Sequence, residues 1–244
     1  MSLLDANRLL PIEPATRKIA QELFAQVEDL PLICPHGHTD PRWFAENEAF
    51  PDPAQLFVTP DHYVFRMLFS QGVNLTDLGV PRSDGGPTET DGRKIWRVFA
   101  ENFHLLRATP SRMWIDHAFE TVFGITERFG PDTADKTYDH IASCLTQPDF
   151  RPRALFDRFN IEAISTTENP LDDLHWHEMI QKSGWSGKVV TAYRPDNVVD
   201  PEFEGFVTNI EKLGALTNCD TSNWPGYLEA HRVRRAFFKS YGAT

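Results

Sequence analysis

The most constraining feature of this sequence is the alternation of strand-like and helix-like segments after residue 160. The runs 161–167 and 187–193 have the length and apolar, β-branched character of buried strands. Helical spacing follows over about 169–182 and 201–213, and a last helix is predicted over about 223–240. Strands that alternate with helices pair in parallel, so this part of the chain predicts an α/β fold.

One further strand is predicted near the N-terminus, where the apolar run 30–35 follows an opening helix over 14–28. In that helix Ile19, Leu23 and Val27 recur at helical spacing and would share one face. Three strands cannot close a β/α barrel, which needs eight, and they leave unpaired edges. The chain is therefore expected to belong to a longer polypeptide or to be completed by another chain.

The segment between the first and second strands has a different character. Helical patterns dominate residues 61–160, with a turn-rich break at 81–87. They predict a large helical insertion after the first strand. The expected organisation is 1–60 for the opening helix, the first strand and the loop after it, 61–160 for the insertion, and 161–244 for the second and third strands with their helices. Together these segments are expected to form one continuous but incomplete domain.

The charge balance and composition exclude several classes of partner. A net charge of -11 argues against nucleic acid, because binding phosphates takes clustered basic side chains. The one basic cluster, Arg232, Arg234 and Arg235, is expected to be a solvated helix face. No apolar run approaches the length of about 18 residues that a membrane span needs. The three separated cysteines suit a reducing compartment, so a cytoplasmic protein is expected.

Two histidines directly follow the first strand. His36 and His38 flank Gly37, and side chains at i and i+2 of an extended segment point to the same side. Neutral imidazoles that converge on one point make a half-site for a divalent metal, with zinc the first expectation. The alternative is a pair of solvent-facing loop histidines. Asp40-Pro41 then opens a helix, and strand, ligand pair and helix in this order are typical of the active-site end of a β/α barrel.

Two other positions carry side chains that suit catalysis. Tyr63 follows His62, and a tyrosine can act as a general acid or base when a cation stabilises its phenolate. The alternative is an ordinary helix that Asp61 caps. Arg194 comes directly after the third strand, where a guanidinium could bind a carboxylate through two parallel bonds or could simply close a loop.

The remaining polar candidates are expected to have structural roles. Thr166, Thr167 and Glu168 end the second strand and are expected to cap the helix after it. His175 and His177 repeat the H-x-H pattern, but within a helix, where side chains two residues apart diverge and cannot share a metal.

Four segments together resemble the uronate isomerase (glucuronate isomerase) family, the isomerase branch of the amidohydrolase superfamily. They are 34–38, which reads CPHGH; 61–66, DHYVFR; 165–172, STTENPLD; and 193–196, YRPD. They occur in the family's order and at compatible spacing, including the helical insertion. The resemblance covers essentially the whole chain, but only the first part of the family's length.

The resemblance implies the N-terminal part of a distorted (β/α)8 TIM-like barrel and an intramolecular oxidoreductase of the aldose–ketose type. The reaction it implies interconverts hexuronates, D-glucuronate with D-fructuronate and D-galacturonate with D-tagaturonate, by proton transfer between C1 and C2. This reaction belongs to pentose and glucuronate interconversion. At the matching positions, His36 and His38 bind a divalent metal, usually zinc; Tyr63, with His62 nearby, transfers the proton; and Arg194 binds the substrate.

The family's later metal-binding Asp, the Arg close after it and a His near the middle of the barrel lie beyond Thr244. By this resemblance the chain alone is catalytically incomplete, and we expect a homo-oligomer or association with the missing C-terminal half. Two alternatives stay open. One is a metal-dependent hydrolase of the same superfamily, in which the metal activates water. The other is a non-catalytic fragment or binding subunit.

Overall fold

The computed structural model describes residues 3–243 and has an α/β architecture. The described chain divides into two compact units. The sheet unit comprises Leu30–Glu48 and the described residues from Pro152 onward. The helical unit comprises Ala49–Arg151 and the described residues up to Asp29. The chain therefore leaves the sheet unit after the first strand and returns to it before the second.

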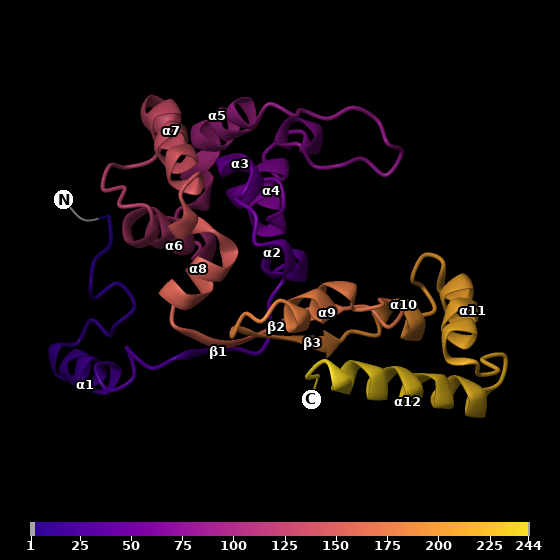
Figure 1. The fold of residues 1–244 in the computed structure, drawn as a ribbon. Helices are drawn as coiled ribbons and strands as arrows, with labels where there is room; N and C mark the ends of the chain where they lie inside the picture. Colours follow the sequence, from indigo (N-terminus) through magenta and orange to yellow (C-terminus); the bar gives the residue numbers. More distant parts are fainter. Residues whose placement is uncertain (1–2, 244) are drawn as a thin grey trace. The chain divides into compact units, whose positions relative to one another are not determined.

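Three parallel strands form the sheet, in the order β1-β2-β3 (Figure 1). They are β1 (Leu32–Cys34), β2 (Ile161–Glu168) and β3 (Lys188–Tyr193). The three predicted strands are confirmed, although β1 is shorter than the run 30–35. Cys34 lies opposite Ile164, and Thr166 lies opposite Thr191. β2 is thus the central strand of the three and holds the other two in register.

Helices accompany the strands within the sheet unit. They are α2 (Pro41–Glu46), α8 (Pro152–Arg158), α9 (His175–Lys182), α10 (Asp196–Val199), α11 (Phe206–Thr217) and α12 (Trp224–Ser240). Both α9 and α12 contact β3 (Figure 1). Apolar side chains from β2, β3 and the helices form a small core that includes Phe44, Phe156, Ile164, Ile180 and Val189. Their burial supplies the main driving force for folding of this unit.

The predicted start of α9 at residue 169 is wrong. α9 begins only at His175, because side chains before it cap turns. Asn169 Oδ1 accepts the N–H of Leu171 at 2.9 Å, and Asp172 Oδ1 accepts the N–H of Leu174 at 2.7 Å. The predicted capping roles of residues 166–168 are therefore wrong as well. Asx turns compete locally with a helix start for the same backbone donors.

The helix predicted over 201–213 also begins later. Residues 201–205 form turns after the short α10, and α11 starts at Phe206 after Gly205, which has a φ of 78°. Glycine adopts this left-handed conformation without the steric cost that other residues meet. The final predicted helix, by contrast, agrees closely with α12.

The helical unit contains only helices and turns over its described residues. Its α-helices are α1 (Pro14–Phe24), α3 (Pro53–Phe57), α4 (His62–Phe69), α5 (Gly92–Asn102), α6 (Pro110–His117) and α7 (Ala134–Leu145). Short 3₁₀ or π elements are η1 (Leu75–Leu78), η2 (Phe103–Leu106), η3 (Ala118–Val122), η4 (Pro131–Thr133) and η5 (Pro148–Phe150). The opening helix ends at Phe24, short of the predicted 28, and its Ile19 and Leu23 remain 57% and 66% exposed.

Aromatic packing holds the helical unit together. Trp96 on α5 is fully buried, and its ring lies 5.0 to 6.1 Å from the rings of Phe99, Phe119 and Phe129. The indole N–H donates to the carbonyl of Ala134 at 3.0 Å, so the buried polar atom is satisfied. Large aromatic rings bury much apolar area each, which makes this group the main source of stability in the unit.

The basic cluster on α12 is not uniformly solvated, so that prediction is wrong for Arg234. Arg232 and Arg235 are exposed, but Arg234 is buried. Its Nε donates to Pro170 O and one Nη to Asp172 O, both at 2.6 Å. Arg234 therefore ties α12 to the turn between β2 and α9.

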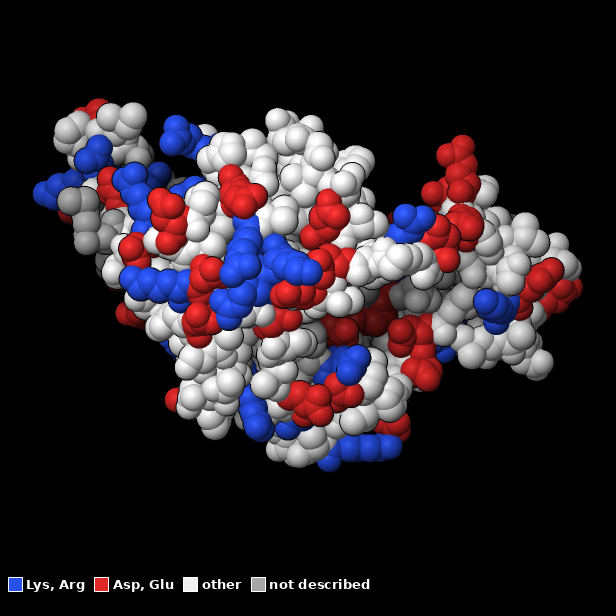
Figure 2. Space-filling view, turned by 90° about the horizontal axis from the view of Figure 1, so that it is seen from above, with Lys and Arg blue, Asp and Glu red and all other residues white. Residues whose placement is uncertain are grey.

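Surface charges of the two signs lie side by side. On the face seen in Figure 2, the basic side chains of the described residues are interspersed with acidic ones. In the helical unit Arg97 pairs with Asp135 at 2.9 Å, and Arg93 contacts both Asp135 and Asp139. Within residues 3–243, no helix combines the length and the apolar character that crossing a membrane requires.

Candidate active site

The carboxyl edge of the sheet gathers most of the candidate residues. His36 and His38 follow β1, Glu168 ends β2, and Arg194 follows β3. Because the three strands are parallel neighbours, their carboxyl ends lie at one edge. Ligands of α/β proteins bind beyond this edge of the sheet, so it is the first candidate for an active site.

The structure brings the two histidines together. Their Nε2 atoms are 3.2 Å apart, and their rings meet edge to face with centroids separated by 5.1 Å. Zinc–nitrogen bonds of about 2.0–2.1 Å at a tetrahedral angle would separate two ligating nitrogens by about 3.3–3.4 Å. Both side chains are exposed. The pair therefore has the donor type and spacing of two ligands to one divalent ion, and its metal-binding role remains a prediction.

The segments around the pair are well supported. A Cβ at Gly37 would lie 3.5 Å from Ser165 O, so the loop runs close over β2. Asp40 caps α2 by accepting the N–H of Arg42 at 2.9 Å, as predicted. Arg153 of α8 donates to Phe44 O at 2.8 Å and fixes the far end of α2. No group of three or more His, Cys, Asp or Glu side chains suited to a metal ion occurs among residues 3–243.

Arg194 stands at the same edge on β3. Its backbone N–H donates to Glu168 O at 3.0 Å and continues the β2–β3 ladder beyond the strand. Its side chain is 52% exposed, and Nε donates to Asp196 Oδ2 at 2.9 Å. This bond from Arg194 lowers the pKa of Asp196. The rest of the guanidinium faces solvent, so its N–H groups can donate to a substrate carboxylate.

A buried polar cluster beneath this edge was not predicted. Thr166, Glu168, His177 and Thr191 are all less than a tenth exposed. The Thr191 hydroxyl donates to Glu168 Oε2, and Thr166 Oγ1 lies 3.0 Å from His177 Nε2. The signal was present in β2, where one face changes from apolar Ile164 to polar residues toward the carboxyl end. His177 lies in this cluster while His175 is exposed, so the H-x-H pair on α9 does diverge.

Burial governs the ionisation of this cluster. It raises the pKa of the Glu168 carboxyl, an effect that hydrogen bonds from Thr191 and Thr166 partly offset. It lowers the pKa of His177. His177 Nδ1 is buried and has no hydrogen-bond partner. Both shifts favour the uncharged side chains, which is the usual response of buried ionisable groups.

Tyr63 and His62 begin α4 in the helical unit. Asp61 caps this helix, since its carboxylate accepts the N–H of Tyr63 at 2.8 Å and that of Val64 at 3.4 Å. The capping interpretation is therefore confirmed for Asp61. The Tyr63 side chain is 57% exposed, and its ring lies 4.2 Å from that of His62 and 6.5 Å from that of Trp114. An exposed phenol beside an imidazole can exchange protons with a bound molecule.

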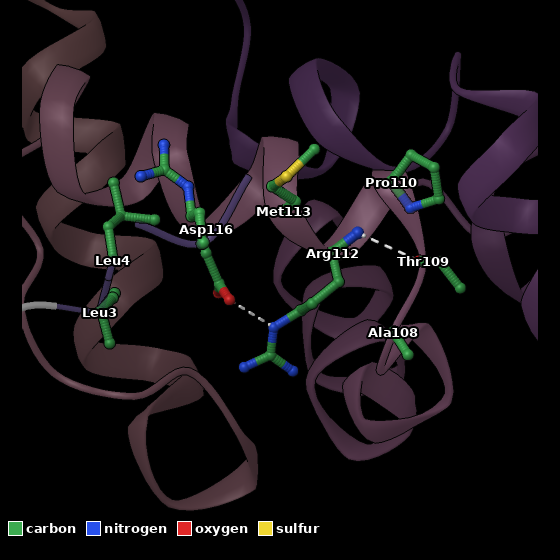
Figure 3. Close-up of a pocket in the computed structure, with 9 residues that line it drawn as sticks. Leu3, Leu4, Ala108, Thr109, Pro110, Arg112, Met113 and Asp116 are labelled. Atoms are coloured by element: carbon green, nitrogen blue, oxygen red, sulfur yellow. Dashed lines mark hydrogen bonds and ion pairs between the residues drawn. The ribbon is translucent and has the colours of Figure 1, made fainter. Parts of the chain in front are cut away.

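The helical unit also contains a cavity. It has a volume of about 440 Å³ and lies between the N-terminal segment at Leu3 and Leu4 and the start of α6 around Met113 (Figure 3). Arg112 points across it but is held by Asp116, with Nε to Oδ2 at 2.7 Å (Figure 3). None of the predicted site residues lines this cavity, so we assign it no part in the site.

His231, for which the sequence offers no role, is buried on α12. Its Nδ1 lies 2.8 Å from the hydroxyl of Tyr193, the last residue of β3. Burial raises the pKa of Tyr193 to about 12 and lowers that of His231. Both residues line a cavity of about 480 Å³ beside the end of β3. Both shifts favour the neutral side chains, and the bond between them links α12 to the strand that precedes Arg194.

Known proteins match the chain along its whole described length. The sequence model of the glucuronate isomerase family matches residues 11–244. A uronate isomerase of Mesorhizobium japonicum is 62% identical over 244 residues, and one of Rhizobium meliloti is 61% identical over 242 residues. The crystal structure of glucuronate isomerase from Caulobacter crescentus superposes with a TM-score of 0.94 at 51% identity. A uronate isomerase structure from Thermotoga maritima gives a TM-score of 0.86 at 25% identity.

These relatives are longer than the chain. The match covers all of this chain but 52% of the Mesorhizobium protein, and 99% of this chain but 52% of the Rhizobium protein. It covers 50% of the Caulobacter structure and 51% of the Thermotoga structure. The chain spans about half the length of the curated relatives it matches.

Proposed function

The chain belongs to the glucuronate isomerase family, and on that premise we propose that it supplies the first part of a hexuronate isomerase active site. The substrates are D-glucuronate and D-galacturonate, which are converted to D-fructuronate and D-tagaturonate. The observation that carries the proposal is the pair His36 and His38, with Nε2 atoms 3.2 Å apart, at the sheet edge that also carries Arg194. The enzyme acts in the cytoplasm, where its free cysteines stay reduced.

The three strands form the first part of a distorted (β/α)8 barrel, and residues 49–151 of the helical unit are an insertion between its first two strands. The support is the sheet topology, in which β1 and β3 each have a neighbour on one side only. Strands from outside these residues, either from the rest of the polypeptide or from a second copy, pair with the outer edges of β1 and β3. Closed pairing removes the exposed strand edges that an open sheet leaves.

His36 and His38 hold a divalent metal, for which zinc is the first candidate. Two imidazole nitrogens at this spacing fit two positions of a tetrahedral site, and further ligands come from outside residues 3–243. When bound, the ion supplies positive charge that stabilises the oxyanion of an enediol.

The side chains of this chain perform the remaining steps. Arg194 binds the substrate carboxylate through its open guanidinium edge and so orients the sugar acid at the sheet edge. Tyr63, with His62 beside it, moves a proton between C2 and C1. Loss of the C2 proton gives an enediol, and its return at C1 gives the ketose. An acid–base pair is needed because neither carbon exchanges protons readily in water.

Product identity tests the reaction. The complete isomerase is incubated with D-glucuronate in D₂O, and the products are identified by NMR. We expect the ketose acid, with deuterium from solvent at C1, because the proton passes through an exchangeable group. Hydrolysis of an amide or ester substrate with no ketose formed from uronates would instead favour a hydrolase of the same superfamily.

Metal content tests the histidine pair directly. Wild-type protein, His36→Ala and His38→Ala are loaded with zinc, dialysed and analysed for bound metal. His175→Ala is the matched control, because it removes an exposed histidine from the H-x-H pair on α9. We expect loss of zinc in the first two variants and retention in the control. Full zinc content in His36→Ala and His38→Ala would overturn the assignment.

A further inference from the structure

The carboxyl half of the sheet carries a buried polar patch where an apolar one would be expected. On the face of β2 that packs toward α9, Ile164 is followed by Thr166 and Glu168, and on β3 Val189 is followed by Thr191. Parallel strands that are covered by helices ordinarily read as apolar runs. The change to polar residues occurs in both strands at the end that leads to the candidate active site.

A buried carboxyl group is expensive to maintain. Glu168 is only 8% exposed, and removing a carboxylate from water costs free energy unless hydrogen bonds replace its hydration. An apolar side chain of similar volume would fill the same space without that cost. We therefore attribute the carboxyl group at this position to the hydrogen bonds that it accepts.

The hydrogen bonds have a consistent direction. Thr191 donates its hydroxyl proton to Glu168 Oε2. Thr166 donates its hydroxyl proton to the backbone carbonyl of Val190 on β3, and Thr166 Oγ1 lies 3.3 Å from that carbonyl oxygen. Thr166 Oγ1 then accepts from His177 Nε2 at 3.0 Å, which assigns the proton of a neutral imidazole to Nε2. This arrangement leaves a lone pair, rather than an N–H, at the unpartnered Nδ1. Thr191 is thus the hydroxyl that donates to Glu168, while Thr166 bonds to His177 and to the β3 backbone beside it.

Glu168 accepts hydrogen bonds from β3 and from the residue after it at two points. Its side chain accepts from Thr191, and its backbone carbonyl accepts the N–H of Arg194 at 3.0 Å. We propose that Glu168 is a positioning residue, whose buried carboxylate holds the end of β3 against β2 and so fixes where Arg194 starts at the sheet edge. The use of that position to bind a uronate rests on the proposed function of Arg194.

The position of Arg194 then depends on the ionisation of Glu168. The groups whose charge acts on Glu168 are Asp172 and Asp40, and neutral His177 lies with its Nε2 3.8 Å from Oε2. Hydrogen bonds to a carboxylate are about twice as strong as those to a neutral group. Protonation of Glu168 at low pH therefore weakens its bond from Thr191 and loosens the end of β3.

Amide hydrogen exchange in the 244-residue chain measures this directly. The protection of the Arg194 N–H is compared in wild type, Thr191→Val, which removes the donor at nearly constant shape, and Thr191→Ser, which keeps it. Thr217→Val is the matched control, because it removes a hydroxyl bonded to Leu213 O on α11, away from the cluster. We expect protection at Arg194 to fall about tenfold in Thr191→Val and to recover in Thr191→Ser.

A pH series distinguishes positioning from simple packing. In wild type, the protection of Arg194, corrected for intrinsic exchange, should decrease as Glu168 becomes protonated. In Glu168→Gln, which is isosteric and uncharged, it should be low and independent of pH; this comparison holds even if Thr191→Val does not fold. Unchanged protection in a folded Thr191→Val, or identical pH profiles for wild type and Glu168→Gln, would overturn the proposal. Neither measurement requires isomerase activity, so failure of the proposed function is detected separately.

Discussion

Arg234 allows a stability prediction whose size follows from the structure. Arg234→Ala removes the donors of two hydrogen bonds, to Pro170 O and Asp172 O, each at 2.6 Å. A hydrogen bond from a charged group contributes about 1.5–3 kcal/mol. Part of this gain offsets the desolvation of a guanidinium that is only 6% exposed, so the lower value applies to each bond. We expect the free energy of unfolding of the sheet unit to fall by about 3 kcal/mol.

Urea unfolding followed by circular dichroism gives this difference, provided that the m-value is unchanged. Arg232→Ala is the matched control on the same helix, because Arg232 is exposed and pairs with Glu229 at the surface. Exposed pairs contribute at most about 1 kcal/mol. Arg234→Lys should fall between the two, since an ammonium lacks the planar fork that reaches both carbonyls. Equal losses in Arg234→Ala and Arg232→Ala would refute the reasoning, because the buried bonds would then contribute nothing net.

Three further predictions concern catalysis and pH. Arg194→Lys in the complete isomerase should raise KM for hexuronates about tenfold with a smaller change in kcat, and unchanged kinetics would leave Arg194 only a loop-closing role. Tyr63→Phe should lower kcat at least about a hundredfold while substrate still binds, as measured by steady-state kinetics and calorimetry; near-normal turnover would remove Tyr63 from the proton transfer. Because burial lowers the pKa of His177 from 6.5, the unfolded chain takes up its proton first as the pH falls, and stability is lost below about pH 6.5. His177→Gln should flatten that loss in urea unfolding at about pH 8 and 5.5, and an unaltered slope would contradict the assignment.

The parts of the fold that depend on local pattern could be predicted from the sequence. β2 and β3 are runs bounded by turn residues, and α12 has an N-cap Asn223 followed by a proline within its first turn. The start of α9 could not be predicted in this way. Asn169-Pro170 reads as a helix start, but the Asn169 side chain instead caps a turn, and Arg234, distant in sequence, holds the carbonyls of that turn. Tertiary contact decided between two locally acceptable conformations.

The same distinction applies to the candidate site. Convergence of His36 and His38 follows from their spacing beyond a strand, and the structure brings their Nε2 atoms together. The contact of Glu168 with Thr191 depends on strand register across 23 residues of sequence, which no local pattern specifies. Helical geometry predicts that the side chains of His175 and His177 diverge, and in the structure His177 is buried while His175 is exposed. The burial of His177 against Thr166 depends on where α9 packs, which only the folded structure reveals.

The exposure of β1 bears on what completes the site. Leu32 and Ile33 are 51% and 65% exposed, although they are apolar residues of a parallel strand, a type of strand that is normally covered on both faces. An uncovered apolar edge strand is a surface for pairing with further protein. The histidine pair follows this strand directly, so protein that pairs with β1 would also reach the neighbourhood of His36 and His38. The chain spans about half the length of the uronate isomerases of Mesorhizobium japonicum and Rhizobium meliloti. We therefore expect protein that covers the edge of β1 to contribute also to the metal site proposed for His36 and His38.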